Sequence, residues 1–393
     1  MADRVSDSRQ EPRISTAVVV KAALALFWSR LGSLNALEMV RPAKIWKNWL
    51  GQPACSADSM GRIAAGIQAD TLRQGIHHVY DRLKRNKALP DIHGLAVAVL
   101  DGHETSASYA RCCAGCLRRT IHSAQGDRVQ FYHRNVTLML LCDAPAGRPA
   151  LRLLLDLEPQ QPGEDEVATA QRLLERVLPA YPRAFDLLLA DALYSTAPFL
   201  NFLLARGKHA LVVLKDERRN LYQDAAGLWE QTQPQVSQYH SRNCLWWDFP
   251  ELLSWPELNA PMRVVRSTES WTEKPQLDRH PILRTSDWVW ATTLSVAQAR
   301  TAQVVAFGHQ RWDIENHGFN ALANGWHADH VYHHEPNAIL CFLLLAFLAC
   351  NIFEAFFALN LKPQVRGGRT QAFWTRLIAV ELHAEILPAS MSP

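Results

Sequence analysis

The chain has 393 residues, of which 48% are hydrophobic and 20% are charged. This composition is typical of a folded protein with room for two or three domains, and it excludes a mainly disordered or collagen-like chain. The formal net charge of +3 neither requires nor excludes a nucleic-acid partner, so local clusters of basic residues have to decide that question.

The N-terminal part of the chain is predicted to be helical. Residues 1–13 are polar, and we expect them to be disordered. Residues 14–93 show helical periodicity broken at Pro42 and Pro53, which predicts a helical N-terminal domain. Two consecutive helices, 56–68 and 70–85, could form a helix-turn-helix that binds DNA, and an ordinary helical bundle fits the same pattern.

From Leu95 the pattern changes to that of an α/β domain. The apolar runs LAVAVL and FDLLLA each lead directly into an acidic residue, Asp101 and Asp191. Open α/β sheets place their functional sites at the carboxyl ends of strands, which is where we expect both aspartates. The other predicted elements in this part are strands 129–142, 150–157 and 210–214 and helices 165–181 and 198–206. The strand of residues 95–100 and strands 129–142 and 150–157 are predicted to form an antiparallel meander.

The run of residues 111–119 (RCCAGCLRR) combines basic residues with a CxxC motif. Arg118 and Arg119 are candidate DNA contacts, and a solvated charged face is the alternative. Cys113 and Cys116 could hold zinc if Cys112, His122 or His133 completed a tetrahedral site. A single CxxC is a weak signal, so we favour a plain turn with buried thiols.

Residues 216–287 read as an inserted β-rich subdomain, because they contain short extended runs, several prolines and five tryptophans. Trp246 and Trp247 are candidates for stacking on DNA bases. Packing in a small core is the alternative. Lys215, just before this subdomain, is a candidate phosphate contact, and a last strand is predicted at 288–294.

The C-terminal part begins with a helical-looking stretch, residues 310–324, that carries a third acidic residue, Glu315. Arg311 precedes it by four residues, so on a helix the two side chains share a face. Residues 338–361 are apolar enough to span a membrane. Asn351 and Glu354 interrupt this stretch, which favours a buried core helix.

Three carboxylates of this kind can hold a pair of divalent cations, since Mg²⁺ prefers oxygen ligands. Their order, with spacings of 90 and 124 residues, resembles that of the DDE transposases of bacterial insertion sequences. The resemblance is strongest in the R-W-x-I-E-x-x-x-F pattern of residues 311–319 and covers residues 95–359. Gly308 and Leu322 stand where this family's Tyr-Arg-Glu-Lys signature has its tyrosine and lysine.

The resemblance implies an RNase H-like mixed sheet with flanking helices over residues 94–215 and 288–362, interrupted by the insertion and followed by a tail, 363–393. It implies a catalytic, metal-binding triad of Asp101, Asp191 and Glu315 that uses Mg²⁺, or Mn²⁺ in its place. The implied activity is cleavage at the inverted repeats of a mobile element and joining of the 3′-OH ends to target DNA. A homodimer in the bacterial cytoplasm, near the nucleoid and not in a membrane, would carry this out.

Two other classes of function remain open. Residues 327–334 (HADHVYHH) could be a zinc cluster of a hydrolase, although no glutamate follows the first histidine as in an HExxH motif. We favour a phosphate contact by His327. The other alternative is a catalytically disabled, transposase-derived protein that only binds DNA.

Overall fold

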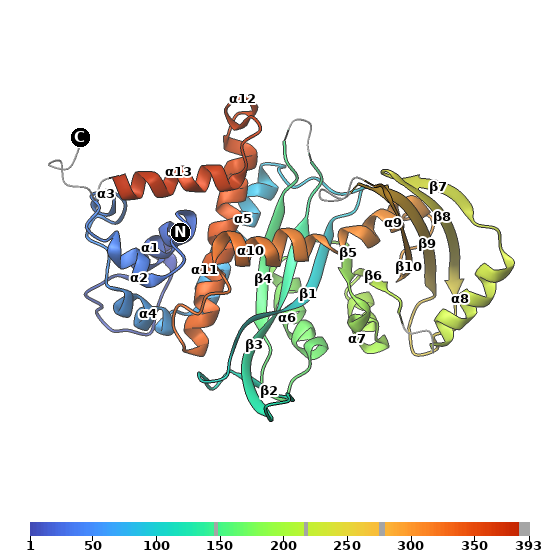
Figure 1. Cartoon of the computed structure of the whole chain (residues 1–393), viewed down its shortest axis with the longest axis horizontal. Helices are drawn as coiled ribbons and strands as arrows, with labels where there is room; N and C mark the ends of the chain where they lie inside the picture. The colour runs from blue at the N-terminus through green and yellow to red at the C-terminus, as the bar shows by residue number, and fades with distance from the viewer. Residues whose placement is uncertain (145–147, 216–218, 275–279, 385–393) are drawn as a thin grey trace. The chain divides into compact units, whose positions relative to one another are not determined.

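The computed structural model describes residues 1–144, 148–215, 219–274 and 280–384. The chain folds into two compact units of mixed α/β structure (Figure 1). The first unit comprises Met1–Asp91, Gly102–Pro182 and Ile314–Pro393, and the second comprises Ile92–Asp101 and Arg183–Asp313. The chain passes from one unit to the other inside a single strand, β1 (Val97–Ser108).

The N-terminal residues are helical, as the periodicity predicted. The helices are α1 (Thr16–Trp28), α2 (Leu34–Met39), α3 (Ile45–Leu50), α4 (Ala57–Gly66) and α5 (Ala69–Arg85). Pro42 and Pro53 lie between helices, as expected for residues that lack an N–H donor. Helix α5 buries one face inside the unit through Leu72, Ile76 and Tyr80, as a helix of an ordinary bundle does. The helix-turn-helix reading of α4 and α5 stays a prediction.

Residues 1–13 are not disordered in the structure, which corrects our expectation. Ala2 lies in a short 3₁₀ helix and is buried, together with Val5. Asp7 forms a β-bridge with Ile67, and its carboxylate accepts a hydrogen bond from the Thr16 hydroxyl at 2.6 Å. These contacts are made with residues far along the chain, and sequence polarity alone does not show them.

The apolar helix α11 (Pro336–Ala355) is the core of the first unit. It packs against α1, α4, α5 and the strand β4, and it continues as a π-helical segment, Phe356–Asn360. By length and composition the helix could cross a membrane, but 72% of its apolar window is buried inside the protein. This agrees with the predicted core helix.

The first unit also contains an antiparallel group of strands. They are β2 (Leu117–Ile121), β3 (Arg128–Leu141) and β4 (Arg152–Pro159), with β3 pairing to both β2 and β4 and lying next to β1. Helix α6 (Glu166–Ala180) follows and matches the predicted helix 165–181, and the Asp165 side chain caps its start. Strand β2 was not predicted, because its basic run lacks apolar alternation and becomes a strand only by pairing with β3.

The second unit contains the parallel part of the sheet. The first half of β1 pairs in parallel with β5 (Leu187–Ala190), and β5 pairs in parallel with β6 (His209–Val213). Both β5 and β6 match predicted strands, as α7 (Ala197–Leu204) matches a predicted helix. All four residues of β5 are buried, which is typical of a central strand in a parallel sheet.

The predicted insertion is mostly β structure in the residues that the structure describes, which leave out 216–218 and 275–279. It starts with a helix, α8 (Asn220–Gln231), followed by the antiparallel strands β7 (Gln235–Tyr239), β8 (Arg242–Leu252), β9 (Met262–Glu273) and β10 (Ile282–Thr292). The expected boundary at residue 287 falls inside β10. That strand pairs with β9 along its whole length and with β6 at its end, so insertion and central sheet share it.

Further helical segments complete the described part of the chain. Counted over the described residues, these segments are five: α9 (Thr301–Gln310), a π-helix η3 (Ile314–Phe319), α10 (Asn320–Trp326), α12 (Pro363–Arg366) and, in the region predicted as a tail, α13 (Gln371–Ala384). Helix α13 contacts α1, so residues 371–384 are part of the first unit's packing. Residues 385–393 of the predicted tail lie outside the described part of the chain.

Candidate active site

Asp101 and Asp191 lie beside each other on neighbouring strands. The parallel register pairs Val99 of β1 with Leu189 of β5. Asp101 comes two residues after Val99, and Asp191 comes two residues after Leu189. Side chains two residues apart along a strand point to the same face, and neighbouring strands are about 4.8 Å apart. Both carboxylates are half-buried. The structure therefore brings together two of the three predicted carboxylates in the second unit.

Asp101 does not end its strand, which corrects our expectation. It is the fifth residue of β1, and the strand continues to Ser108 because its second half lies next to β3. Asp191 does follow the last residue of β5. Its side chain caps a short 3₁₀ helix by accepting a hydrogen bond from the Leu193 N–H at 2.8 Å. Each carboxylate is thus held by regular backbone.

Arg311 lies against Asp101. Its Nη1 atom is 3.5 Å from Asp101 Oδ2, and the arginine side chain is only 7% exposed. The guanidinium also lies over the Trp312 ring, 4.3 Å from its centre. We expected Arg311 and Glu315 to share one helix face, but α9 ends at Gln310 and a turn separates Arg311 from the π-helix. The positive charge beside Asp101 favours the ionised carboxylate.

Helix α9, which leads into Arg311, is anchored by a buried carboxylate that the sequence analysis missed. Glu269 of β9 is 0% exposed and lies 2.6 Å from His309 Nε2, and it accepts a hydrogen bond from Arg242 at 2.7 Å. Burial acts to raise the pKa of Glu269, but the hydrogen bonds from His309 and Arg242 outweigh it and lower that pKa. No sequence motif identifies Glu269 as important. It meets Arg242 only because β8 and β9 pair in the antiparallel sheet.

Glu315 lies in the π-helix η3 of the first unit and is half-exposed. At the end of this π-helix, the Phe319 ring stacks on His103, with the ring centres 4.4 Å apart. His103 belongs to the second half of β1, two residues after Asp101 in the chain. π-Helical turns are rare, and they occur frequently at functional sites. The segment that carries Glu315 is therefore packed on β1.

A family model described as "Transposase DDE domain" matches residues 120–352, which is more than half of the chain. The chain belongs to the DDE transposase family. The match contains Asp191 and Glu315 and begins 19 residues after Asp101. No curated protein matches the chain. Membership of this family means a transposase-type enzyme that acts on DNA, and such enzymes generally use divalent metal ions.

In this transposase, packing against Trp290 leaves no room for a side chain at position 308. A Cβ atom on Gly308 would lie 2.5 Å from Trp290 Nε1, 2.7 Å from Cδ2 and closer still to Cε2 of the same ring. Trp290 of β10 is 1% exposed, so the ring cannot move aside at low cost. At the position of the signature's lysine, Leu322 is buried, with 6% exposed. Both positions are therefore occupied by packing residues of the transposase.

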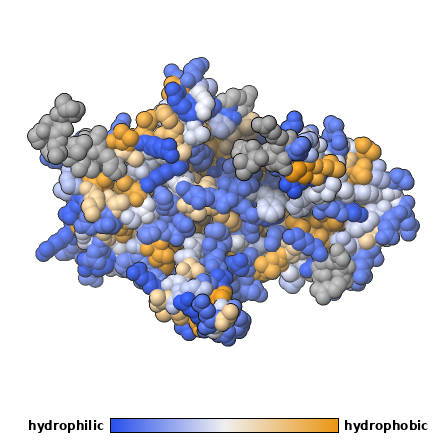
Figure 2. All heavy atoms as spheres, in the orientation of Figure 1, coloured by the Kyte–Doolittle hydropathy of each residue, from blue (hydrophilic) through white to orange (hydrophobic). Residues whose placement is uncertain are grey.

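The predicted DNA-binding arginines lie on the hairpin formed by β2 and the first part of β3, which we call the basic hairpin (residues 109–133). Arg118 and Arg119 are both exposed and lie over the rings of Phe131 and Tyr132. Arg119 also forms an ion pair with Glu104 at 2.8 Å, so the structure places Glu104 in a surface pair. On the face shown in Figure 2, the end of this hairpin carries hydrophilic and hydrophobic residues side by side.

The two tryptophans proposed to stack on DNA have different positions. Trp246 is buried, with 4% exposed, and donates a hydrogen bond to the Ser267 hydroxyl, so it belongs to the core of the β-rich subdomain. This corrects our prediction of Trp246 as a base-stacking residue. Trp247 points to the other face of β8 and is half-buried, with Arg266 5.1 Å from its ring centre. Lys215 follows β6 and is exposed.

His327 ends α10 in a left-handed conformation with φ of 52°. Its ring lies beside Gly32, where an added Cβ atom would be 3.5 Å from it, and its carbonyl accepts a hydrogen bond from the Tyr332 hydroxyl at 3.1 Å. The neighbouring His333 packs against Gly61 of α4. In the described residues, the side chains of 327–334 form no cluster of three metal-ligand groups. This disfavours the hydrolase-type zinc cluster.

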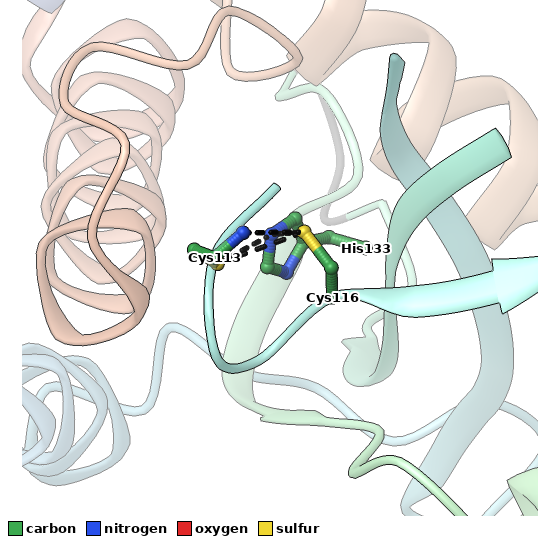
Figure 3. Close-up of side chains that lie close together, drawn as sticks. All are labelled: Cys113, Cys116 and His133. Atoms are coloured by element: carbon green, nitrogen blue, oxygen red, sulfur yellow. Dashed lines mark hydrogen bonds between the residues drawn. The ribbon is translucent and has the colours of Figure 1, made fainter. Parts of the chain in front are cut away.

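The CxxC motif is part of such a cluster. Cys113, Cys116 and His133 place their ligand atoms within 4.8 Å of one another (Figure 3). Of the other candidates, His122 pairs with Asp127 instead, and Cys112 is exposed. Burial raises the pKa of the Cys113 thiol to about 11 and lowers the pKa of His133, with a further contribution from His334. We return to this cluster below.

A second acidic residue that the sequence analysis missed is Glu166, in the first turn of α6. Its side chain is 8% exposed and forms an ion pair with Arg134 at 3.0 Å. The carboxylate occupies the space where residue 102, next to Asp101 in the chain, would carry a Cβ atom. Gly102 is therefore required for this packing. In the sequence, Glu166 looks like an ordinary acidic residue at a helix N-terminus.

Proposed function

We propose that this protein is an active insertion-sequence transposase in which Asp101, Asp191 and Glu315 hold two divalent metal ions, Mg²⁺ or, in its place, Mn²⁺. The enzyme would cut at the terminal inverted repeats of its element and join the 3′-OH ends to target DNA. The observation that carries the proposal is the side-by-side position of Asp101 and Asp191 on parallel strands in a chain of this family.

The donor set fits such ions. Carboxylate oxygens are the ligands that Mg²⁺ prefers, and Asp101 and Asp191 would offer theirs from neighbouring parallel strands. The strand order also supports an RNase H-like domain, since β4, β3 and β1 are neighbours in the first unit and β1, β5 and β6 are neighbours in the second. Packing of the Glu315 segment on β1 supports the third ligand.

Bound ions in such a site activate a water or a 3′-hydroxyl and stabilise the leaving oxygen of the phosphodiester. The residues of the protein orient these groups. Rigid backbone fixes the directions of the Asp101 and Asp191 carboxylates, so little reorganisation is needed when DNA binds. Arg311 lies against Asp101 and offers a planar guanidinium that can also contact a phosphate oxygen.

DNA would be held by basic residues of both units. Arg118 and Arg119 on the basic hairpin combine positive charge with aromatic rings, a combination that suits contacts with the phosphate backbone and with unpaired bases. Lys215 and Trp247 are the candidates in the second unit, and His327 is the candidate in the first. We further propose that two copies of the chain pair the two element ends, in the cytoplasm near the nucleoid.

The test is cleavage of a DNA duplex that carries the flanking inverted repeat, in Mg²⁺ or Mn²⁺. We expect Asp191→Asn to lower cleavage by more than about 100-fold, because even changes behind a metal ligand cost 10–100-fold. Asparagine keeps the Oδ1 acceptor for the Leu193 N–H, so the backbone cap is preserved. Asp186→Asn, at the other end of β5, is the matched control and should cleave normally.

Glu315→Gln tests the third ligand in the same assay, with Asp313→Asn as its control. Cleavage lost in Glu315→Gln and kept in Asp313→Asn would support the triad. Native protein that binds the repeat but does not cut it in either metal would instead support the alternative, a repurposed DNA-binding relative. Equal cleavage by the native chain and by Asp191→Asn would refute the assignment.

A further inference from the structure

The loop that precedes β2 and the strand β3 bring three potential metal ligands together. Cys113 and Cys116 lie on the two sides of a tight turn in which the Cys116 N–H donates to the Cys113 carbonyl at 3.2 Å. His133 lies on β3, next to Tyr132, which pairs with Leu117 at the start of β2. Figure 3 shows the His133 ring between the two cysteine side chains. Strand pairing thus fixes the histidine beside the CxxC turn.

The distances between the ligand atoms match the edges of a zinc tetrahedron. The two Sγ atoms are 3.7 Å apart, and each is 3.3 Å from His133 Nε2. With Zn–S bonds of about 2.3 Å and Zn–N bonds of about 2.0–2.1 Å, tetrahedral geometry requires about 3.8 Å between sulfurs and about 3.6 Å between sulfur and nitrogen. The three atoms therefore need to move by only a few tenths of an ångström to bind one ion.

We propose that Cys113, Cys116 and His133 form a structural zinc site with His334 as the fourth ligand. The His334 ring is the next potential ligand, with its centre 6.4 Å from the centre of the His133 ring. Two thiolates and two imidazoles form a Cys₂His₂ set, one of the usual closed sets of structural zinc sites. Binding releases the two thiol protons to solvent, and no electron is transferred.

The surroundings favour a metal over a disulfide. The sulfur atoms are 3.7 Å apart, well beyond the 2.03–2.05 Å of a disulfide bond, and both cysteines are free. The Cys113 N–H donates to Cys116 Sγ at 3.2 Å. Such N–H donors stabilise thiolate ligands from the second shell. Cys116 and His133 are buried, so the ion would be shielded from solvent.

The site would fix the basic hairpin to the start of α11. A Cβ atom on Gly115, inside the CxxC turn, would be 3.4 Å from the Pro336 side chain, so the turn is already packed against that helix. His334 lies two residues before Pro336 in the chain. A zinc ion shared by the turn, β3 and His334 would hold Arg118 and Arg119 in position for DNA. This role rests on the proposed function, whereas the metal site itself does not.

The first experiment measures zinc in the full-length protein by elemental analysis after reconstitution with Zn²⁺ and desalting. We expect one zinc per native chain, less than about 0.2 in Cys116→Ser and His133→Ala, and one in the control Cys112→Ser, whose thiol is exposed. Replacing zinc by Co²⁺ should produce the sulfur-to-cobalt charge-transfer bands of a tetrahedral thiolate site, and these should be absent in Cys116→Ser. Circular dichroism reports whether each variant is folded.

Three results would contradict the proposal. A native chain that takes up no zinc would refute the site, and equal zinc in the native chain and a folded His133→Ala variant would place the metal elsewhere. His334→Ala should weaken zinc binding at least 10-fold, and an unchanged affinity would refute the fourth ligand. Asp191→Asn should lose cleavage but keep its zinc, whereas Cys116→Ser should lose its zinc. The two variants therefore test the proposed function and the zinc site separately.

Discussion

Asn351 shows how a polar residue can be essential inside an apolar helix. Its side chain is 2% exposed, in the middle of α11. The amide nitrogen donates to the Leu154 carbonyl at 2.8 Å, and the amide oxygen accepts from the Leu154 N–H at 2.9 Å. Leu154 adjoins a β-bulge, where the register of β3 and β4 shifts between Leu138 and Met139. Among the described strands β4 pairs with β3 alone, so Asn351 satisfies both backbone polar groups of Leu154 in place of a strand partner.

Replacing Asn351 by leucine has two effects of opposite sign on the free energy of unfolding. Each buried backbone group left without a partner costs about 1–3 kcal/mol, so the two Leu154 groups cost about 4 kcal/mol together. Burying the leucine side chain returns about 2 kcal/mol. We therefore expect Asn351→Leu to lower the free energy of unfolding by about 2 kcal/mol, although the helix becomes more apolar.

The assay is thermal unfolding followed by calorimetry and circular dichroism. For a cooperative unit of about 250 residues, 2 kcal/mol corresponds to a decrease in melting temperature of about 4–8 °C. Asn324→Leu, at an exposed position of α10, is the matched control and should change stability by less than about 0.5 kcal/mol. Amide exchange at Leu154 should also become faster. An Asn351→Leu variant as stable as the native chain would refute the hydrogen-bond argument.

Two further predictions concern the second unit. Gly308→Ala places a methyl group in the Trp290 ring and should destabilise the protein by about 1–3 kcal/mol in urea unfolding. The control Gly227→Ala, an open position in α8, should be neutral or stabilising, and equal effects of the two changes would contradict this reading. The lowered pKa of Glu269 lies below its value in the unfolded chain, about 4.3, so its contribution to stability is complete above that pH and is lost as pH falls through the folded value. The stability difference between the native chain and Glu269→Gln should therefore shrink below about pH 4, and a constant difference from pH 6 to pH 3 would contradict this assignment.

The local pattern of apolar residues was sufficient to predict many of the helices and strands. Helices α5 and α6 and strands β5 and β6 agree with their predicted positions to within a few residues, because each buries one periodic face or a continuous apolar run. The aspartates that follow the runs ending at Leu100 and Ala190 could be recognised for the same reason. A family motif identified Glu315, and the family match contains that residue.

The remaining features depend on residues that are far apart in the sequence. Strand β2 exists because β3 pairs with it, and His133 rather than His122 joins the CxxC turn because the register of that pairing places it there. Trp246 and Trp247 are neighbours in the sequence, but the pleat of β8 buries one and leaves the other half-exposed. Sequence therefore determined most of the elements and the three candidate carboxylates, whereas tertiary pairing decided which side chains meet, since register and burial are set by contacts between strands.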